Sequence, residues 1–339
     1  MRAYEIVAGS TSFEGLKRGS RADPAAQAGQ ILVRLQAASL NFRDLMVARG
    51  LYFGGPLSSA TIPLSDGTGE VVSVGSGVTR FKPGDRVCGT FFRGWTDGRT
   101  PDGPRASLGA PPADGVLAEY AVFNEQDAVA VPAHLSPEAA ATLPCAAVTA
   151  WHALIENGHV IPGQTVLVLG TGGVSIFALQ FARLAGARVL AISSSDQKLE
   201  RARQLGAEGG VNYRKTPDWE TEILRLTQGR GVDHVIEVGG VGTLGRSMAA
   251  VAPGGAIQLI GVLTGRGAEV PSPYALMAKQ ANLQGVFVGS RAHFERMNAA
   301  IAAARLDPVI DRVFSFDEAP AAYRHLEQGA HFGKVVVRI

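Results

Sequence analysis

Residues 166–193 read VLVLGTGGVSIFALQFARLAGARVLAIS, and this stretch decides the fold. An apolar strand runs directly into a turn with Gly170, Gly172 and Gly173, and an apolar helix and a second strand follow. In a dinucleotide-binding turn, the first glycine permits the tight turn and the second lets the backbone approach a pyrophosphate at the helix N-terminus. Ser175 stands at the third glycine position, where a small residue still allows helix and strand to pack closely. The alternative is a glycine-rich turn without a ligand, and the strand–helix–strand pattern favours binding over it.

Strands and helices alternate from residue 165 onward. This alternation indicates a parallel sheet with helices on both faces. We expect strands at 165–169, 188–192, 232–238, 256–260 and 283–288, and helices at 176–185 and 198–205. The predicted fold class is therefore α/β, with a doubly wound parallel sheet in this part of the chain.

The two ends of the chain have a different pattern. Short alternating segments separated by Gly, Pro and Asp indicate a mostly β unit, with strands at 31–35, 69–74 and 86–89. Residues 91–115 hold five Gly and four Pro and predict a long surface loop. The tail predicts two helices and a strand at 334–339, which are too little for a core of their own and should rejoin the N-terminal unit. We expect a substrate domain of residues 1–146 completed by 291–339, and a dinucleotide-binding domain of residues 147–290.

Composition limits the class of protein. The 339 residues exceed the usual size of one core, and 46% hydrophobic with 18% charged residues is the balance of a folded globular protein. The net charge is +2, and Lys and Arg form no basic block that would suggest a nucleic-acid partner. We find no secretory signal pattern and no apolar run of about 18 residues, so we expect a cytoplasmic protein without a membrane partner. Cys88 and Cys145 are expected to be free thiols.

The strand that ends at Ser193 bears on the choice between NAD(H) and NADP(H). An NAD-preferring site places an acidic residue there to hold the ribose 2′-hydroxyl, and a serine cannot do so. Ser193, Ser194 and Ser195 are followed by Asp196, Lys198 and, one turn onward, Arg201. Hydroxyls with cations suit a 2′-phosphate. The alternative is that these serines cap a helix and that Lys198 lies on its solvated face. We favour NADP(H).

Several further segments resemble the medium-chain dehydrogenase/reductase superfamily, and within it the zinc-free, quinone oxidoreductase-like and zinc-type alcohol dehydrogenase-like branch. They are NFRDL from Asn41, IPLSDGTGEVVSVGSGV from Ile62, KPGDRV from Lys82, LPCAAVTAWHAL from Leu143, the glycine turn, VNYR from Val211 and the terminal HFGKVVVRI. Each motif is common, but their order and spacing are specific and span nearly the whole chain. The resemblance implies a GroES-like, mostly β domain made from both ends, a Rossmann domain between them, and an active site in the cleft between the domains.

The resemblance also implies cofactor contacts. Ser194 and Lys198 match the SSxxK pattern of NADP-using relatives, and Tyr213 matches a tyrosine that packs near the 2′-phosphate. Other positions match the helix start or the strand ends near the nicotinamide, namely Gly173, Val174, Val238, Gly239, Gly261, Val262, Val288, Gly289 and Ser290. The resemblance further implies a homodimer formed through the Rossmann domain. The apolar segment 283–288 supports this, since an edge strand exposes unpaired backbone groups unless it is covered.

Zinc-dependent relatives hold a catalytic metal with three protein ligands, typically cysteine, histidine and a second cysteine. The matching positions here are Asn41, Ser65 and Cys145, and neither an asparagine nor a serine is a strong replacement. Residues 91–115 contain no cysteine, so the four-cysteine lobe of structural zinc is absent too. We therefore expect no metal, and we interpret Cys145 as a small buried residue.

Hydride transfer without a metal needs hydrogen-bond donors for the developing oxyanion. By resemblance to segments that line the substrate cleft, the candidates are Asn41, which can donate its amide, and Tyr52, which can donate or relay a proton. The alternatives are that Asn41 caps a helix beginning at Phe42 and that Tyr52 is an exposed loop aromatic. Arg43 and Asp44 are expected to form a structural pair.

Without a metal to activate an alcohol, the expected reaction is reduction of a small-molecule quinone or enone, with hydride going to the β-carbon. Alternative functions are an NADP(H)-dependent alcohol dehydrogenase and an NADPH-binding protein without turnover. The pattern leaves open whether Phe53, Phe91, Phe92 and Trp95 line the substrate pocket or form the core of a loop.

Overall fold

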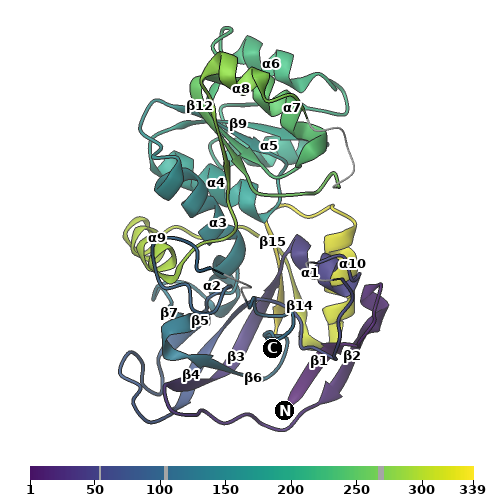
Figure 1. Cartoon of the computed structure of the whole chain (residues 1–339), viewed down its shortest axis with the longest axis vertical. Coiled ribbons are helices and arrows are strands. Elements are labelled where there is room, and N and C mark those ends of the chain that lie inside the picture. Colours follow the sequence, from purple (N-terminus) through teal and green to yellow (C-terminus); the bar gives the residue numbers. More distant parts are fainter. Residues whose placement is uncertain (53–54, 103–105, 266–270) are drawn as a thin grey trace. The chain divides into compact units, whose positions relative to one another are not determined.

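The computed structural model describes residues 1–52, 55–102, 106–265 and 271–339. The chain divides into two compact units (Figure 1). The terminal unit comprises Met1–Val148 and Gly289–Ile339, and the central unit comprises Thr149–Val288. The sequence predicts these divisions after residues 146 and 290. None of the helices in the described residues is both long and apolar enough to cross a membrane.

The central unit is built on a parallel sheet. In the described residues its six strands lie in the order β10-β9-β8-β11-β12-β13. The strands are β8 (Thr165–Leu169), β9 (Arg188–Ser193), β10 (Gly209–Asn212), β11 (Val232–Glu237), β12 (Val251–Leu259) and β13 (Asn282–Gly285). Figure 1 shows helices around this sheet, namely α4 (Gly173–Leu184), α5 (Asp196–Gln204), α6 (Trp219–Leu226), α7 (Val241–Ala250) and α8 (Tyr274–Lys279). The predicted α/β class with a doubly wound parallel sheet is confirmed.

The strand order determines where this sheet can bind a ligand. Every residue of β8 and β11 is buried, as expected for central strands that are covered on both faces. The chain runs from β8 outward to β9 and β10, and then returns to β11 on the other side of β8. The carboxyl ends of β8 and β11 therefore flank the point where the strand order reverses, which is where open sheets of this kind bind ligands. The glycine turn follows β8 directly.

The terminal unit is mostly β. An antiparallel ribbon of β1 (Arg2–Ile6) and β2 (Leu16–Ser20) accompanies a larger sheet, which has seven strands in the described part of the unit. That sheet runs β14-β15-β3-β4-β5-β7, with β6 also paired to β3. Its strands are β3 (Gln30–Leu40), β4 (Asp66–Val74), β5 (Arg86–Gly89), β6 (Tyr120–Asn124), β7 (Ala128–Ala130), β14 (Ile310–Ser315) and β15 (Lys334–Arg338). Helices α1 (Phe42–Ala48), α2 (Pro137–Ala140), α9 (Arg291–Ala304) and α10 (Ala319–Glu327) belong to this unit.

A run of helical turns links the two units in sequence. It consists of Leu143–Ala147, α3 (Val148–Trp151) and His152–Asn157. Within the terminal unit, β15 pairs antiparallel with β3, so that Val335 stands opposite Leu40. The tail therefore joins the N-terminal sheet as predicted, and this pairing brings Lys334 to the end of β3.

Two local predictions need correction. The strand predicted at 283–288 ends at Gly285, and Val286 is buried beyond it. Residues 91–102 and 106–115 have little regular structure, but Phe91, Phe92 and Trp95 are at most 4% exposed, and the ring centroids of Phe91 and Phe92 lie 4.7 Å apart. Their burial favours the alternative that these aromatics form the core of the segment, because removing apolar rings from water is favourable. Phe53 lies outside the described residues.

Candidate functional site

The glycine turn has the geometry of a phosphate-binding turn. Gly170 follows β8 with a φ of +74°, a conformation that favours glycine, and its N–H donates to the carbonyl of Ile192 at 2.8 Å. Gly172 is extended and serves as the N-cap of α4, so Gly173 and Val174 form the first turn of a twelve-residue helix. The first N–H groups of a helix have no partner within it, and the helix dipole makes this end positive. The predicted residues 170–174 therefore lie in one turn, at the helix end whose free N–H groups are suited to an anion.

Ser175 fits the position of the third glycine. It is 1% exposed, and its hydroxyl donates to the carbonyl of Leu169 at 2.6 Å. The side chain thus returns to the preceding strand and lets α4 pack closely on the sheet. The serine is therefore accommodated in place of glycine, because its buried hydroxyl is hydrogen-bonded.

The residues predicted to hold the 2′-phosphate lie at the ends of two neighbouring strands. Ser193 ends β9, and its carbonyl accepts from the N–H of Tyr213, which follows β10, at 3.0 Å. Ser195 is the N-cap of α5 and accepts from the N–H of Lys198 at 3.4 Å, which places Lys198 in the first turn of that helix. Ser194 lies between these two serines. The structure therefore gathers Ser193, Ser194, Lys198 and Tyr213 at one edge of the sheet, and the helix cap that the sequence left as an alternative is also present.

Asp196 is the acidic residue nearest to this edge in sequence. Its carboxylate accepts from Asn212 Nδ2 at 2.7 Å and pairs with Lys215 Nζ at 2.5 Å. The hydrogen bonds from Lys215 and Asn212 hold the pKa of Asp196 below its ordinary value. This carboxylate is therefore engaged by groups of the protein itself.

Glu237, which the sequence analysis missed, organises the end of β11. It is fully buried, and Oε1 accepts from the N–H groups of Gly239 and Gly240 at 2.8 and 3.0 Å. Its oxygens also accept from the hydroxyls of Thr243 and Ser247 at 2.6 and 2.5 Å. Four donors thus fix the turn that carries the predicted residues Val238 and Gly239. The sequence gives one indication of this role, because Glu237 ends an apolar strand and two glycines follow closely.

The glycines at the ends of β11 and β12 are required by packing. A Cβ on Gly239 would lie 2.2 Å from Thr243 Oγ1, and one on Gly261 would lie 2.0 Å from the carbonyl oxygen of Val238. Gly261 and Val262 therefore lie next to Val238 at the carboxyl end of the sheet, where they were predicted to border the nicotinamide. This close approach explains both glycines with or without a ligand.

The last predicted cofactor segment, Val288 to Ser290, crosses from one unit to the other. Val288 belongs to the central unit and has a φ of +55°, and its carbonyl accepts from Nδ1 of His152 at 2.7 Å. Burial lowers the pKa of His152. Gly289 and Ser290 belong to the terminal unit, where Ser290 caps α9 by accepting from the N–H of His293.

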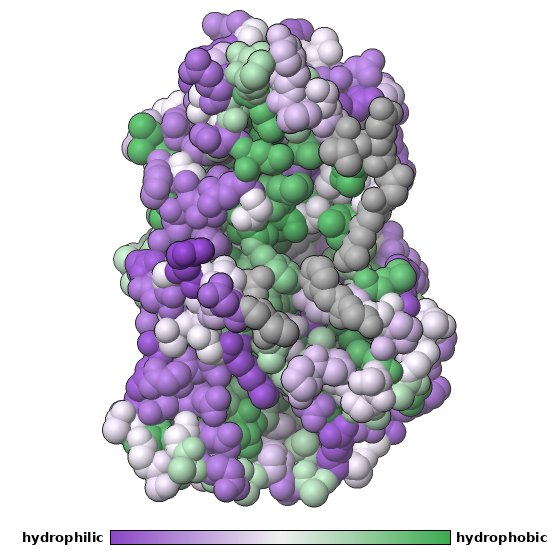
Figure 2. Space-filling view, in the orientation of Figure 1, coloured by the Kyte–Doolittle hydropathy of each residue, from purple (hydrophilic) through white to green (hydrophobic). Residues whose placement is uncertain are grey.

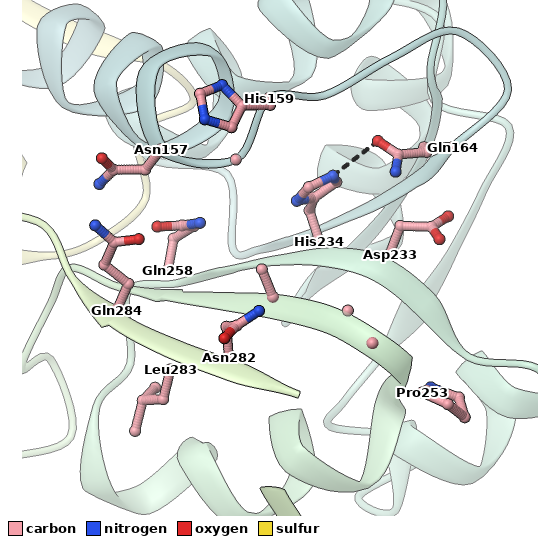
Figure 3. Close-up of a pocket in the computed structure, with 14 residues that line it drawn as sticks. Asn157, His159, Gln164, Asp233, His234, Pro253, Gln258, Asn282, Leu283 and Gln284 are labelled. Atoms are coloured by element: carbon pink, nitrogen blue, oxygen red, sulfur yellow. Dashed lines mark hydrogen bonds between the residues drawn. The ribbon is translucent and has the colours of Figure 1, made fainter. Parts of the chain in front are cut away.

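A separate polar pocket of about 480 Å³ lies in the central unit (Figure 3). Gln164 precedes β8, His234 lies near the start of β11 and Asn282 begins β13, so the pocket lies at the amino ends of the strands. His234 Nε2 bonds to Gln164 Oε1 at 2.9 Å, and burial lowers the pKa of His234. Because the glycine turn lies at the opposite, carboxyl ends, we do not assign this pocket to the cofactor.

Asn41, in the terminal unit, stands at the N-cap of α1. Its backbone N–H donates to Asp44 Oδ2 at 2.7 Å, while its side-chain Oδ1 accepts from Lys334 Nζ at 2.5 Å. Lys334 also donates to the carbonyl of Leu40 at 2.7 Å and lies 3.7 Å from Asp66 Oδ2. The Asn41 side chain is therefore held by a buried ammonium in addition to its place at the helix start.

Ser65 and Cys145 occupy the other two positions that match zinc ligands, and both donate a hydrogen bond to Asp66. The Ser65 hydroxyl donates to Oδ1 at 2.7 Å, and the backbone N–H of Cys145 donates to Oδ2 at 3.2 Å. Burial raises the pKa of the Cys145 thiol. Among the described residues, no three His, Cys, Asp or Glu side chains are grouped as metal ligands. With an ammonium on Asn41, these donors do not fit a zinc ion.

Arg43 and Asp44 form the expected structural pair. Both are buried, with Arg43 Nη1 3.1 Å from Asp44 Oδ1, and Arg43 also donates to the carbonyl of Leu108 and the hydroxyl of Ser107. Burial raises the pKa of Asp44 to about 6, against the opposing effect of Arg43. The guanidinium lies 4.5 Å from the centre of the Tyr52 ring, which packs partly buried against the core. Tyr52 is therefore not the exposed loop aromatic that the sequence left as an alternative.

Lys334 and Asp66 are the residues of the terminal unit that the sequence analysis missed. Lys334 is 3% exposed although it opens the apolar strand KVVVR, and Asp66 is fully buried. The sequence indicates this pair only weakly. It shows a lysine in an apolar strand and an acid next to Ser65, but it does not show that the two residues meet across the sheet.

Two family models match the chain. The alcohol dehydrogenase GroES-like domain matches residues 27–133, and the zinc-binding dehydrogenase matches residues 173–303. A zinc-type alcohol dehydrogenase-like protein of Schizosaccharomyces pombe is 46% identical over 317 residues, which cover 92% of this chain and 91% of that protein. A quinone oxidoreductase of Pongo abelii is 28% identical over 308 residues, which cover 89% of this chain and 86% of that protein.

Solved structures agree with these matches. An alcohol dehydrogenase-type protein of Sinorhizobium meliloti is 43% identical with a TM-score of 0.90. The match covers 100% of this chain and 99% of that chain. An NAD-dependent alcohol dehydrogenase is 33% identical with a TM-score of 0.91 and covers 100% of both chains. A mycobacterial protein complexed with NADPH is 25% identical with a TM-score of 0.83 and covers 100% of both.

Proposed function

We propose that this chain, which belongs to the medium-chain dehydrogenase/reductase superfamily, reduces quinones or enones with NADPH and without a catalytic zinc. That it is an oxidoreductase of this superfamily follows from its relatives. The observation that carries the zinc-free proposal is the contact between Asn41 Oδ1 and the Lys334 ammonium at 2.5 Å. A cation already lies on the residue where zinc-dependent relatives hold their metal, and a second cation at that place would be repelled.

The central unit supplies the proposed cofactor grip. The N-terminus of α4 with Gly172 would hold the pyrophosphate, and Ser193, Ser194 and Lys198 would hold the 2′-phosphate. One solved relative is named NAD-dependent and another is complexed with NADPH, so the names of relatives do not decide the choice. The proposal rests on the absence of an acid at Ser193 and on Asp196 being engaged by Asn212 and Lys215.

The terminal unit supplies the proposed substrate contacts. When it is bound, NADPH supplies the hydride. The β-carbon of the substrate gains that hydride, the electron pair of the C=C bond moves toward the carbonyl oxygen, and a proton completes the reduction. Asn41 would donate its Nδ2 amide to the oxygen, and the Tyr52 hydroxyl would donate or relay the proton.

An assay of NADPH oxidation with a panel of quinones and enones tests the proposal. Steady oxidation with one of them is expected. Oxidation of secondary alcohols with NADP⁺, and none of the panel reactions, would favour the alcohol dehydrogenase alternative. Tight NADPH binding with no turnover on either panel would favour a binding protein.

Lys198→Ala should narrow the difference between NADPH and NADH affinity by roughly 1 to 3 kcal/mol, because a charge-assisted bond to the 2′-phosphate is lost. Dissociation constants of both cofactors for both proteins measure this change. Arg203→Ala is the matched control, since Arg203 lies farther along α5 and pairs with Glu200. Equal affinity of the unmutated protein for NADPH and NADH would contradict the assignment.

We also propose a homodimer formed through the central unit. Strand β13 is an edge strand of the sheet, and all four of its residues are exposed. Exposed apolar side chains lie on it and on the neighbouring α8, with Leu283 at 39%, Tyr274 at 68% and Met277 at 66% exposure. Hydrophobic residues are also visible at the surface of this unit in Figure 2. A second copy would cover both the backbone edge and these side chains.

Sedimentation velocity at micromolar concentration is expected to give a dimer, and the double variant Leu283→Asp/Met277→Asp is expected to give a monomer. Leu184→Asp, at an equally exposed site on the end of α4, should remain dimeric. A monomeric unmutated protein would contradict the dimer, and a dimer that survives the double variant would contradict this interface.

A further inference from the structure

Lys334 has an unusual environment for a lysine. Its side chain is 3% exposed, and it lies in the terminal unit at the junction of β15 with the end of β3. Nζ donates to Leu40 O at 2.7 Å and to Asn41 Oδ1 at 2.5 Å, and Asp66 Oδ2 lies at 3.7 Å. A charge removed from water is tolerated only when it is paired and hydrogen-bonded. Here two oxygens accept hydrogen bonds from the ammonium, and the Asp66 carboxylate supplies the opposite charge.

This contact determines which way the Asn41 carboxamide points. An ammonium carries donors only, so the atom of Asn41 that faces it is the oxygen. The amide nitrogen is turned away from Lys334. Burial raises the pKa of the nearby Asp66 carboxyl, and Lys334 and the Asn41 side chain oppose that rise. The amide nitrogen is buried, and within the described residues it makes no hydrogen bond of ordinary geometry. A buried N–H without such a partner is costly, and a ligand oxygen would remove that cost.

We propose that Lys334 is a positioning residue for substrate reduction, which holds the Asn41 carboxamide with Nδ2 as the donor to the substrate carbonyl oxygen and polarises that donor. The inference rests on the proposed function and adds a residue to it. A cation on the amide oxygen draws electron density from the amide and strengthens its N–H groups as donors. The positive charge thereby acts on the developing oxyanion through Asn41. Asp66 balances the charge of the ammonium in the fold.

The rival explanation is that Lys334 only neutralises the buried Asp66. The double variant Lys334→Met/Asp66→Asn distinguishes the two, because it removes both charges and leaves no unpaired ion. If Lys334 only neutralises Asp66, turnover should be near normal in this variant. If Lys334 positions Asn41, turnover should fall by about 10- to 100-fold while the NADPH dissociation constant stays within about twofold.

A second variant protects the test against a folding defect. Lys334→Gln/Asp66→Asn is equally uncharged, but its side-chain amide can still donate to Asn41 Oδ1 and to Leu40 O. It should fold as judged by circular dichroism, and its turnover should exceed that of the Met variant and remain below that of the unmutated protein. Equal turnover of the two double variants would overturn the positioning role.

A third experiment tests whether the effect of Lys334 on turnover depends on Asn41. In an Asn41→Ala background, the change Lys334→Met/Asp66→Asn should cost about twofold or less, because the group that Lys334 positions is already gone. The same loss in both backgrounds, or near-normal turnover of the double variant with Asn41 present, overturns this inference alone. An unmutated protein that binds NADPH but oxidises it with no quinone or enone overturns the proposed function and this inference together.

Discussion

Replacement of Asn41 by alanine is expected to lower turnover with the best quinone or enone by about 100- to 1000-fold, the usual effect of removing one donor from a preorganised oxyanion site. Tyr52→Phe should cause a loss of similar size if its hydroxyl delivers the proton. This second variant keeps the ring on which the Arg43 guanidinium lies at 4.5 Å, and it removes only the hydroxyl together with that group's interaction with Arg43. Both variants should bind NADPH almost as the unmutated protein does, because the proposed grip lies on the glycine turn and the 2′-phosphate site.

Turnover and the NADPH dissociation constant, measured together on each variant, check this expectation. If both variants keep near-normal turnover, the proton comes from solvent and the two residues only shape the substrate site. A large loss of NADPH affinity with unchanged turnover would place these side chains in the cofactor grip instead.

The second large effect concerns the stability of the central unit. Glu237→Ala should lower the free energy of unfolding by about 3 kcal/mol or more, since two backbone N–H groups and two hydroxyls lose a buried carboxylate acceptor. It should also weaken NADPH binding, because the turn with Val238 and Gly239 loses its anchor. Urea unfolding followed by circular dichroism, together with the NADPH dissociation constant, measures both effects.

Glu237→Gln is the matched control for this prediction. Its amide oxygen can still accept from Gly239, Gly240 and Thr243, and its amide nitrogen can donate to the Ser247 hydroxyl, so the loss should be about 1 kcal/mol. An alanine variant as stable as the glutamine variant would show that the four bonds contribute little to stability.

The features that the sequence predicts best are those determined by neighbours along the chain. Strands β8 and β5 have the predicted bounds, 165–169 and 86–89, because an apolar run between glycines, prolines or charges determines both their period and their ends. The glycine turn is local in the same sense, since Gly170, Gly172 and the helix start lie within a few residues. The change of pattern along the chain also predicted that the tail rejoins the N-terminal unit, and the resemblance to a known family implied the same arrangement of the domains.

The features that the sequence analysis missed depend on contacts between distant parts of the chain. Lys334 and Asn41 lie 293 positions apart, and only the pairing of β15 with β3 brings them together. No periodic pattern predicts that a lysine in an apolar strand finds a carbonyl, an amide and a carboxylate across the sheet. The burial of Phe91 and Phe92 was difficult to predict for the same reason, because it depends on which distant residues pack over this irregular segment.

The central claim is that a cation and an amide of the protein act where zinc-dependent relatives use a metal. The most direct test is to measure metal content and NADPH oxidation on the same purified protein, before and after dialysis against a strong chelator. The account predicts far less than one zinc per chain and an unchanged rate with the best quinone or enone. One tightly bound zinc per chain, with activity lost on its removal and restored by its return, would contradict it.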